Sequence, residues 1–459
     1  MSKKITKPIC LVLFSIVAFL FAWNNQSLWI DECCMVMSAA QNNFADVWRS
    51  VTDIGGSDTQ MACYLYLLHI WIKLTGADTE IMLRLFNIIW VLIAAFFLRK
   101  EPKILLLLLI SPFFIYYANE LRPYIMQIAV SCGFSIFLYK ISLGEKLSYN
   151  RGFALLFLLC TTSLTSVVWA LGFLMAWIIL EGRNFWSKKL LIPVVCWCIP
   201  FIALGSYYLY TLLLGARATY IKSNAFVNLG ASIYELLGLT GLGPSRSQLR
   251  LCTQVSDVLG QSGMLWALFG AFVVVSVVLY GFFTWRKQAS GRILLAMIAL
   301  FVIPLAIFTY SSSMMNFRFS GRHFAPLLPL VCIVISLGIK WCQNRLYQSV
   351  LSTLFVCLWL VSCVYVRFDE NHSREDYRGA IQYCERRKEN GDNVILLCSD
   401  AGKVYYGWKD YIDPVHWEDC QCVVVSRPED YAAVVRQIEA SNRYHKRKLC
   451  PSFWIYELK

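Results

Sequence analysis

Long apolar runs recur along most of the chain and are separated by short charged loops. A helix needs about 20 apolar residues to cross a bilayer, and by that measure we predict roughly eleven spans. The predicted spans cover 8–23, 79–98, 103–118, 123–140, 152–166, 167–182, 190–211, 263–284, 292–310, 324–340 and 348–366. Hydrophobic residues make up 58% of the chain and charged residues 15%, which excludes a soluble globular protein. We therefore predict an α-helical polytopic membrane protein.

The formal net charge of +13 does not indicate a nucleic-acid partner, because Lys and Arg occur in short clusters between the apolar runs. Under the eleven-span count these clusters all fall on one side of the membrane. They lie within 3–7, 99–103, 140–151, 183–189, 286–292 and 340–345. The positive-inside rule makes that side cytoplasmic. We expect a cytoplasmic N-terminus and no nucleic-acid partner.

Three regions then face outward: a first loop over 24–78, a second loop over 212–263 and a tail over 367–459. In the first loop, Met61 to Leu74 is apolar but too short to span, which is typical of a helix lying in the membrane interface. Tyr64 and other aromatic residues are expected to anchor it.

The tail differs in character from the rest of the chain. A helical pattern opens near Glu375, and strands are predicted at 393–398 and 422–426, with a helix over 428–440 after them. This pattern favours a small α/β domain. We therefore divide the chain into a transmembrane domain, residues 1–366, and an outward domain, residues 367–459.

Asp31 and Glu32 follow the first apolar run directly, so they are expected at the membrane surface. Two interpretations stay open. They are either surface carboxylates hydrated among lipid headgroups, or they supply a general base, for which a partly buried carboxylate with a raised pKa would be suited.

Further charges lie at the same outer surface. Glu120 and Arg122 sit between the third and fourth predicted spans, Arg84 begins the second, and Arg318 and Arg322 precede the tenth. Glu120 and Arg122 could form an ion pair that locks two helices. Alternatively, the arginines gather around an anionic group, because guanidinium binds phosphate well.

Asp58 precedes the interfacial helix, so capping that helix is its simplest role. Asp31, Glu32 and Asp58 could also gather a divalent cation, although no spacing demands one. The sequence requires no cofactor and leaves a metal unknown.

Several stretches, in order along the chain, resemble one family. Trp29-Ile30-Asp31-Glu32 resembles the Trp-x-Asp-Glu motif that follows the first span of bacterial C-type (GT-C) glycosyltransferases, the polytopic enzymes related to protein O-mannosyltransferases and to the aminoarabinose transferase of lipid A. The segment from Ser111 to Tyr124 is similar to the family's Ser-Pro…Tyr-Tyr-x-x-Glu-x-Arg-x-Tyr motif and is the most specific match. Further similar segments are 64–74, 83–85, 322–329 and 376–380. Many members have His-Pro-Pro where this chain has Gln60-Met61-Ala62.

The resemblance implies an inverting glycosyltransferase, a hexosyl- or pentosyltransferase. It would move a sugar from a polyprenyl-phosphate donor to a lipid, glycan or protein acceptor on the periplasmic face of the bacterial inner membrane. Asp31 is then expected to be the catalytic base, supported by the catalytic carboxylate Glu32. The donor phosphate is assigned to Arg84, Glu120, Arg122 and Arg322. Weaker candidates for substrate contact are Asp58, Tyr64, Tyr117 and Tyr124.

The main alternative is a transporter or flippase of lipid-linked sugars, because arginines among eleven spans also suit a substrate pathway. Against it, the charges gather at one surface and not at the bilayer midplane, and no inverted repeat is evident. A non-catalytic receptor or assembly subunit is a third possibility.

Overall fold

The computed structural model describes residues 2–54, 57–214, 224–252, 254–289, 291–315, 317–340, 345–410, 413–450 and 452–459. Each of the predicted spans is helical. The helices are α1 (Ser2–Ala22), α5 (Glu80–Leu85), α6 (Asn87–Leu98), α7 (Pro102–Leu109), α8 (Pro112–Ala118), α9 (Tyr124–Ser142), α10 (Tyr149–Thr162), α11 (Leu164–Glu181), α12 (Leu191–Leu213), α16 (Met264–Gln288), α17 (Ile293–Met315), η5 (Gly321–Leu327) with α18 (Leu328–Lys340), and α19 (Arg345–Phe368).

Eight helical stretches within the described chain are long and apolar enough to cross a membrane, and Ile9–Ala22 is a shorter apolar helix. The protein is therefore a multi-pass membrane protein, as predicted. The count of eleven spans stays a prediction.

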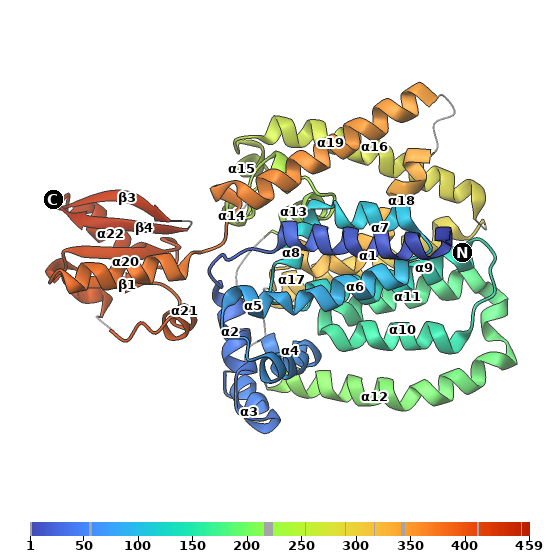
Figure 1. Cartoon of the computed structure of the whole chain (residues 1–459), viewed down its shortest axis with the longest axis horizontal. Helices are drawn as coiled ribbons and strands as arrows, with labels where there is room; N and C mark the ends of the chain where they lie inside the picture. Colours follow the sequence, from blue (N-terminus) through green and yellow to red (C-terminus); the bar gives the residue numbers. More distant parts are fainter. Residues whose placement is uncertain are drawn as a thin grey trace.

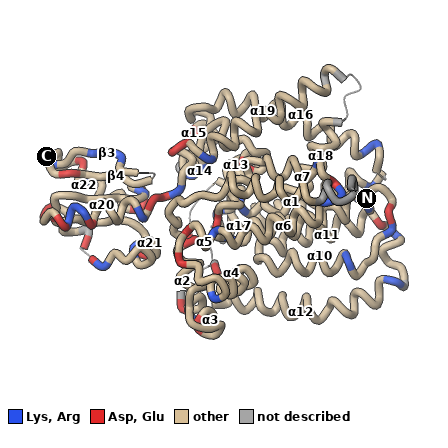
Figure 2. Tube along the Cα trace, in the orientation of Figure 1, with Lys and Arg blue, Asp and Glu red and all other residues tan. Residues whose placement is uncertain are grey.

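The spanning helices run side by side, and the hydrophilic regions gather at one end of them (Figure 1). The C-terminal domain lies at that end, whereas the N-terminus lies toward the other. The loop helices at the same end as the domain are α2 (Ile30–Ala39), α3 (Phe44–Ile54), η1 (Ser57–Met61), α4 (Ala62–Thr75), α13 (Ala225–Leu236), η4 (Thr240–Leu242), α14 (Arg246–Leu251) and α15 (Val255–Leu259). Figure 2 shows charged residues toward the two ends of the bundle and few along its middle.

The third predicted span, 103–118, is not one helix. Pro112 lacks a backbone N–H and restricts the residue before it to extended conformations. Ser111 accordingly has φ −70° and ψ 129°, and it separates α7 from α8. The break separates α7 from the short helix α8, which leads into the loop that carries Glu120 and Arg122.

The helix predicted in the first loop is present as α4, and its location in the membrane interface stays a prediction. Tyr64 was expected to anchor it at the membrane surface, but its side chain is fully buried and its hydroxyl donates to Oδ1 of Asn87 at 2.8 Å. The phenol therefore joins α4 to α6 inside the protein. Parts of the second predicted loop, 215–223 and 253, fall outside the described residues.

The C-terminal domain is a four-stranded sheet with helices on both faces. Its elements are η6 (Glu370–His372), α20 (Tyr377–Glu389), β1 (Val394–Leu397), α21 (Asp400–Tyr405), η7 (Pro414–Asp419), β2 (Cys422–Ser426), α22 (Ala432–Ala440), β3 (Tyr444–Cys450) and β4 (Phe453–Leu458). The strand order is β1-β2-β4-β3, with β1 and β2 parallel and the other pairs antiparallel. Successive side chains of a strand face opposite ways, so Val424 packs with α20 and Val425 with α22.

The sequence predicted β1 and β2 but missed the hairpin of β3 and β4. In β3, the residues from His445 to Lys448 are all polar or charged and exposed. This stretch lacks the alternation of apolar and polar residues by which a strand is predicted. The helix predicted from 428 begins only at Ala432, because Arg427 takes a left-handed conformation, φ 51°, that ends β2 in a turn.

Candidate active site

Asp31 and Glu32 occupy the first turn of α2, directly after an extended segment that leaves α1. The backbone N–H of Trp29 donates to Oε2 of Glu32 at 3.3 Å, which closes the first turn. Acidic side chains are favoured at this position because the helix N-terminus carries partial positive charge. The two neighbouring carboxylates then point to different partners.

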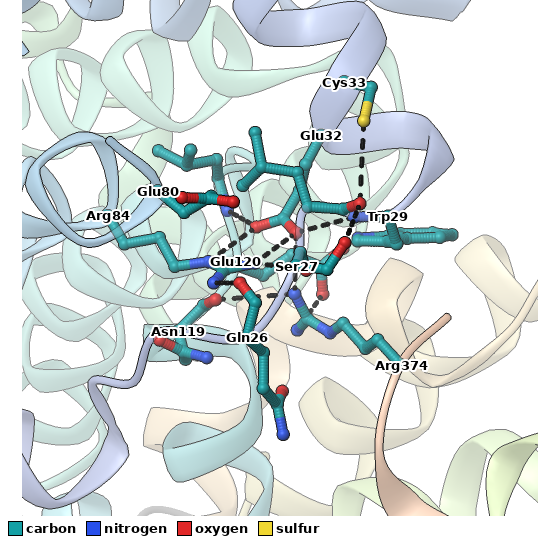
Figure 3. Close-up of polar contacts among 12 residues, drawn as sticks. Gln26, Ser27, Trp29, Glu32, Cys33, Glu80, Arg84, Asn119, Glu120 and Arg374 are labelled. Carbon is teal, nitrogen blue, oxygen red and sulfur yellow. Dashed lines mark hydrogen bonds and ion pairs between the residues drawn. The ribbon is translucent and has the colours of Figure 1, made fainter. Parts of the chain in front are cut away.

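Glu32 faces inward and is fully buried. Arg84 of α5 binds both of its oxygens, with Nε to Oε1 at 3.2 Å and a terminal nitrogen to Oε2 at 2.7 Å. The backbone N–H of Leu121 also donates to Oε1 at 2.8 Å. Figure 3 shows this convergence. Glu32 thus ties together the first loop, α5 and the 119–123 loop.

Arg84 is equally buried, with no exposed side-chain surface. Besides Glu32, its guanidinium donates to the backbone carbonyls of Gln26 and Ser27. These contacts hold the extended segment before α2 in place. The guanidinium that was expected on the donor phosphate therefore faces protein acceptors.

Glu120 belongs to the same buried cluster. Arg374, from the segment that leads into the C-terminal domain, donates to Oε2 of Glu120 at 3.0 Å and lies 3.4 Å from Oε2 of Glu32. Oε1 of Glu120 is buried without a hydrogen-bond partner in the described part of the chain. Burial raises the pKa of Glu120 more than Arg374 lowers it.

Asp31 faces the other way and retains 29% of its side-chain exposure. Its Oδ2 accepts from Arg322 of η5 at 2.9 Å, and its backbone carbonyl accepts from Arg122 at 3.3 Å. Burial by itself would raise the pKa of Asp31, but Arg122 and Arg322 outweigh it and hold the pKa below its ordinary value of 3.8. Asp31 is therefore ionised at neutral pH, so it is a weaker base than a carboxylate of raised pKa would be.

Arg122 is buried and is held by Asp58, with 2.5 Å between a terminal nitrogen and Oδ1. Asp58 lies in η1 and does not cap α4, whose N-cap is Met61. The capping role suggested by its position in the sequence is therefore wrong. Asp58 instead orients a guanidinium beside Asp31.

Three buried N–H donors around Asp31 have no hydrogen-bond partner among the residues that the structure describes. They are Nε of Arg122, Nε of Arg322 and Nε1 of Trp29. The Arg322 guanidinium lies 5.9 Å from the centre of the Trp29 indole. An unsatisfied buried donor costs about 1–3 kcal/mol, so this arrangement favours an incoming group rich in oxygen and negative charge.

A second buried pair comes from the second loop and was not predicted. Arg246 of α14 lies 2.5 Å from Oε2 of Glu235 in α13. The Tyr117 hydroxyl donates to the same oxygen at 3.3 Å, and the Arg246 guanidinium stacks 3.6 Å above the Tyr116 ring. The sequence signal for this pair was Glu235, the one charged residue of α13.

The remaining predicted residues lie near this centre but inside the protein. Tyr117 and Tyr124 are both about 1% exposed, and their rings meet edge to face with centroids 5.2 Å apart. Tyr64 is held by Asn87, which also donates to the backbone carbonyl of Glu120. The structure thus brings the predicted residues together at one end of the bundle.

No group of three or more His, Cys, Asp or Glu side chains suited to a metal ion occurs in the described ranges. Asp31, Glu32 and Asp58, which could have shared a cation, are instead each paired with a different arginine: Arg322, Arg84 and Arg122.

The fold defines a polytopic membrane protein with a C-terminal domain at one end of its helices, and the cluster of carboxylates and arginines lies at that end. A solved structure of the same architecture is ArnT from Cupriavidus metallidurans in the apo state. The two align over 98% of this chain and 97% of that one, with a TM-score of 0.53 and 9% sequence identity. At this identity the likeness shows the fold, and it confirms the predicted fold class.

No family model matches the sequence, and no curated protein matches it.

Proposed function

We propose that this protein is an inverting glycosyltransferase. It moves a hexosyl or pentosyl group from a polyprenyl-phosphate donor to a lipid, glycan or protein acceptor. One observation carries the proposal: the ionised Asp31 lies between Arg122 and Arg322, and each of these guanidinium groups keeps a buried, unused N–H. The ArnT-like fold supports the proposal.

The chemistry needs a proton acceptor and a stabilised leaving group. The acceptor hydroxyl attacks the anomeric carbon, and the bond from that carbon to the phosphate oxygen breaks with its electron pair staying on the phosphate. Asp31 takes the hydroxyl proton. Arg122 and Arg322 stabilise the charge on the departing phosphate, an effect that preorganised donors supply well in a buried site.

Arg322 has two partners in this scheme. It holds Asp31 before the donor binds, and its Nε–H, which has no partner among the described residues, is the donor that we assign to the phosphate. Drawing Arg322 toward the phosphate weakens its hydrogen bond to Asp31, which makes the carboxylate a stronger base when the substrate is in place.

The burial of Glu32 and Arg84 supports different roles from those expected at first. We assign both to positioning, because each is fully buried and engaged by the protein. Glu120 joins them as the partner of Arg374, and Asp58 orients Arg122. We assign a packing role to the three buried tyrosines around the cluster, Tyr64, Tyr117 and Tyr124.

We place the reaction on the periplasmic face of a bacterial inner membrane. The site and the C-terminal domain lie at one end of the bundle, and the loops rich in Lys and Arg lie at the other end (Figure 1). By the positive-inside rule, the end with the basic loops is cytoplasmic.

The test is a transfer assay with purified protein in liposomes, radiolabelled polyprenyl-phosphate sugars and a membrane extract as the source of acceptor. Asp31→Asn should lower transfer by about 10²–10⁴-fold, the usual contribution of a positioned base. Asp53→Asn is the matched control, because Asp53 is an exposed carboxylate of the same loop, and it should transfer as the wild-type protein does.

The alternative function, a flippase of lipid-linked sugars, gives a different result in the same vesicles. Label would then cross the bilayer at equal rates in the wild-type and Asp31→Asn proteins, and no labelled product would form.

A further inference from the structure

Arg374 is buried in the cluster although it belongs to the segment that joins the membrane helices to the C-terminal domain. Only 7% of its side chain is exposed. Its guanidinium donates to the backbone carbonyls of Asn119 at 3.4 Å and Tyr116 at 3.3 Å, and it lies 4.7 Å above the Tyr116 ring. Figure 3 shows it reaching the same point as Arg84 and Glu32.

Charge balance explains why a cation is needed here. Glu32 and Glu120 are two buried carboxylates that share Arg374. Arg84 neutralises Glu32, and Arg374 supplies the second positive charge. Without it, one buried carboxylate would be uncompensated, a state that a protein usually relieves by taking up a proton.

The cluster in turn positions the reacting groups. Glu32 directly follows Asp31 in α2, and Glu120 is two residues before Arg122 in the 119–123 loop. Glu32 also accepts from the backbone of Leu121, so the two segments are joined at this point. Any shift of one segment against the other would move Asp31 relative to Arg122.

The C-terminal domain is fastened to the same segment by additional contacts. The backbone N–H of Leu28 donates to the Tyr406 hydroxyl at 2.7 Å, and that hydroxyl donates to Oε1 of Glu80 at 3.0 Å. Arg378 binds Oε1 of Glu80 at 3.1 Å. The domain therefore rests directly on the stretch that leads into α2.

We propose that Arg374 is a positioning residue. Its positive charge compensates the buried carboxylates of Glu32 and Glu120 and so fixes the segment that carries Asp31 relative to the segment that carries Arg122. The docked C-terminal domain is therefore required for the geometry of the active centre. This inference rests on the proposed glycosyltransferase function.

The test combines charge removal with charge compensation. Arg374→Gln should lower kcat for transfer by about 10- to 100-fold, the scale expected when reacting groups are slightly misplaced, with a much smaller change in KM for the donor. Arg374→Lys keeps the charge and should retain most of the activity. Arg374→Gln/Glu120→Gln, in which the uncompensated charge is removed, should recover most of the lost kcat.

The pH profile separates this role from simple packing. The charged groups that face Glu120 are Arg374, Glu32, Arg322 and Arg246. Losing Arg374 raises the pKa of Glu120 further, so a proton can replace the missing charge as the pH falls. Arg374→Gln should therefore regain activity, relative to wild type, as the pH is lowered from neutral, because the pKa of Glu120 lies above its ordinary value. The double variant should show no such gain.

Arg386→Gln is the matched control, because Arg386 is an exposed arginine of α20 in the same domain and, within the described chain, its guanidinium donates only to the Gln382 carbonyl of its own helix, so it should stay close to wild type. An unchanged kcat in Arg374→Gln, an equal loss in Arg386→Gln, or no recovery in the double variant would overturn the proposal.

If the wild-type protein transfers no sugar, the proposed function fails. The charge compensation is then judged by the pH dependence of thermal unfolding. Arg374→Gln should lose stability toward high pH, where Glu120 must ionise without its partner, and the double variant should not. Identical curves would overturn the inference.

Discussion

Arg84 and Glu32 have no exposed side-chain surface, and both are charged. A buried ion pair adds little when compared with an apolar pair of the same shape, but removing one partner leaves an uncompensated charge. In this protein each partner also satisfies backbone groups, from Gln26 and Ser27 on one side and Leu121 on the other. At the residue scale, Glu32 and Arg84 are engaged by protein groups, and for this reason we assign them to positioning and leave Asp31 as the proposed base.

Glu32→Gln should therefore affect folding before chemistry. We expect it to lower the free energy of unfolding by about 3–5 kcal/mol, because it leaves Arg84 buried without its countercharge. Thermal unfolding in detergent, with transfer measured per folded molecule, checks this. A variant as stable as wild type that has lost more than about 100-fold of its rate would instead make Glu32 a base or acid.

At the scale of elements, the position of η5, and hence of Arg322, depends on how closely α18 packs. Gly281 of α16 and Gly338 of α18 let these helices approach backbone to backbone. A Cβ on Gly281 would lie 1.8 Å from the carbonyl oxygen of Val334. Small residues at membrane-helix contacts allow this kind of close packing.

Gly281→Ala should therefore force the helices apart and destabilise the protein by about 1–3 kcal/mol, as overpacking does. Gly205→Ala in α12 is the control, because a Cβ there meets no atom within 4 Å, and it should be neutral or slightly stabilising. The thermal unfolding midpoints of the two variants test whether α16 and α18 are in backbone contact at Gly281. Equal midpoints would show that the contact between α16 and α18 accepts an added methyl group, which would contradict close packing there.

Much of the architecture could be predicted from the sequence, because apolar runs and turn residues are local signals. The sequence analysis missed the helix break at Ser111, which depends on the single residue Pro112 inside a long apolar run. It also missed the charged strand β3, which forms only by pairing with β4. Within the site, Asp31, Glu120 and Arg122 stand in recognisable motifs. Arg374 was missed because it reaches Glu32 from across the fold, and nothing local marks it beyond its place just after the last span.

At the scale of the whole molecule, the site, the outward loops and the C-terminal domain share one end of the bundle (Figure 1). The segment leading into the docked domain contributes Arg374 to the cluster. We therefore expect transfer to require both the membrane helices and the domain. For the proposed transfer reaction, that end must face the compartment that holds the acceptor.

The sidedness can be measured with reporter fusions in a bacterial host. Alkaline phosphatase fused after Lys459 should be active, because it folds only outside the cytoplasm, and green fluorescent protein fused there should be dark. The same pair fused in the loop near Lys287, between α16 and α17, should give the opposite pattern. A fluorescent C-terminal fusion would reverse the orientation inferred from the basic loops.

The most direct test of the central claim separates donor binding from chemistry in Asp31→Asn. Arg122 and Arg322 stay in place, so the variant should bind a polyprenyl-phosphate sugar at least as tightly as wild type. Its single-turnover transfer rate should fall by about 10²–10⁴-fold. A rate equal to wild type with donor bound would contradict the assignment of Asp31 as base. Loss of donor binding with normal transfer at saturating donor would make Asp31 a binding residue instead.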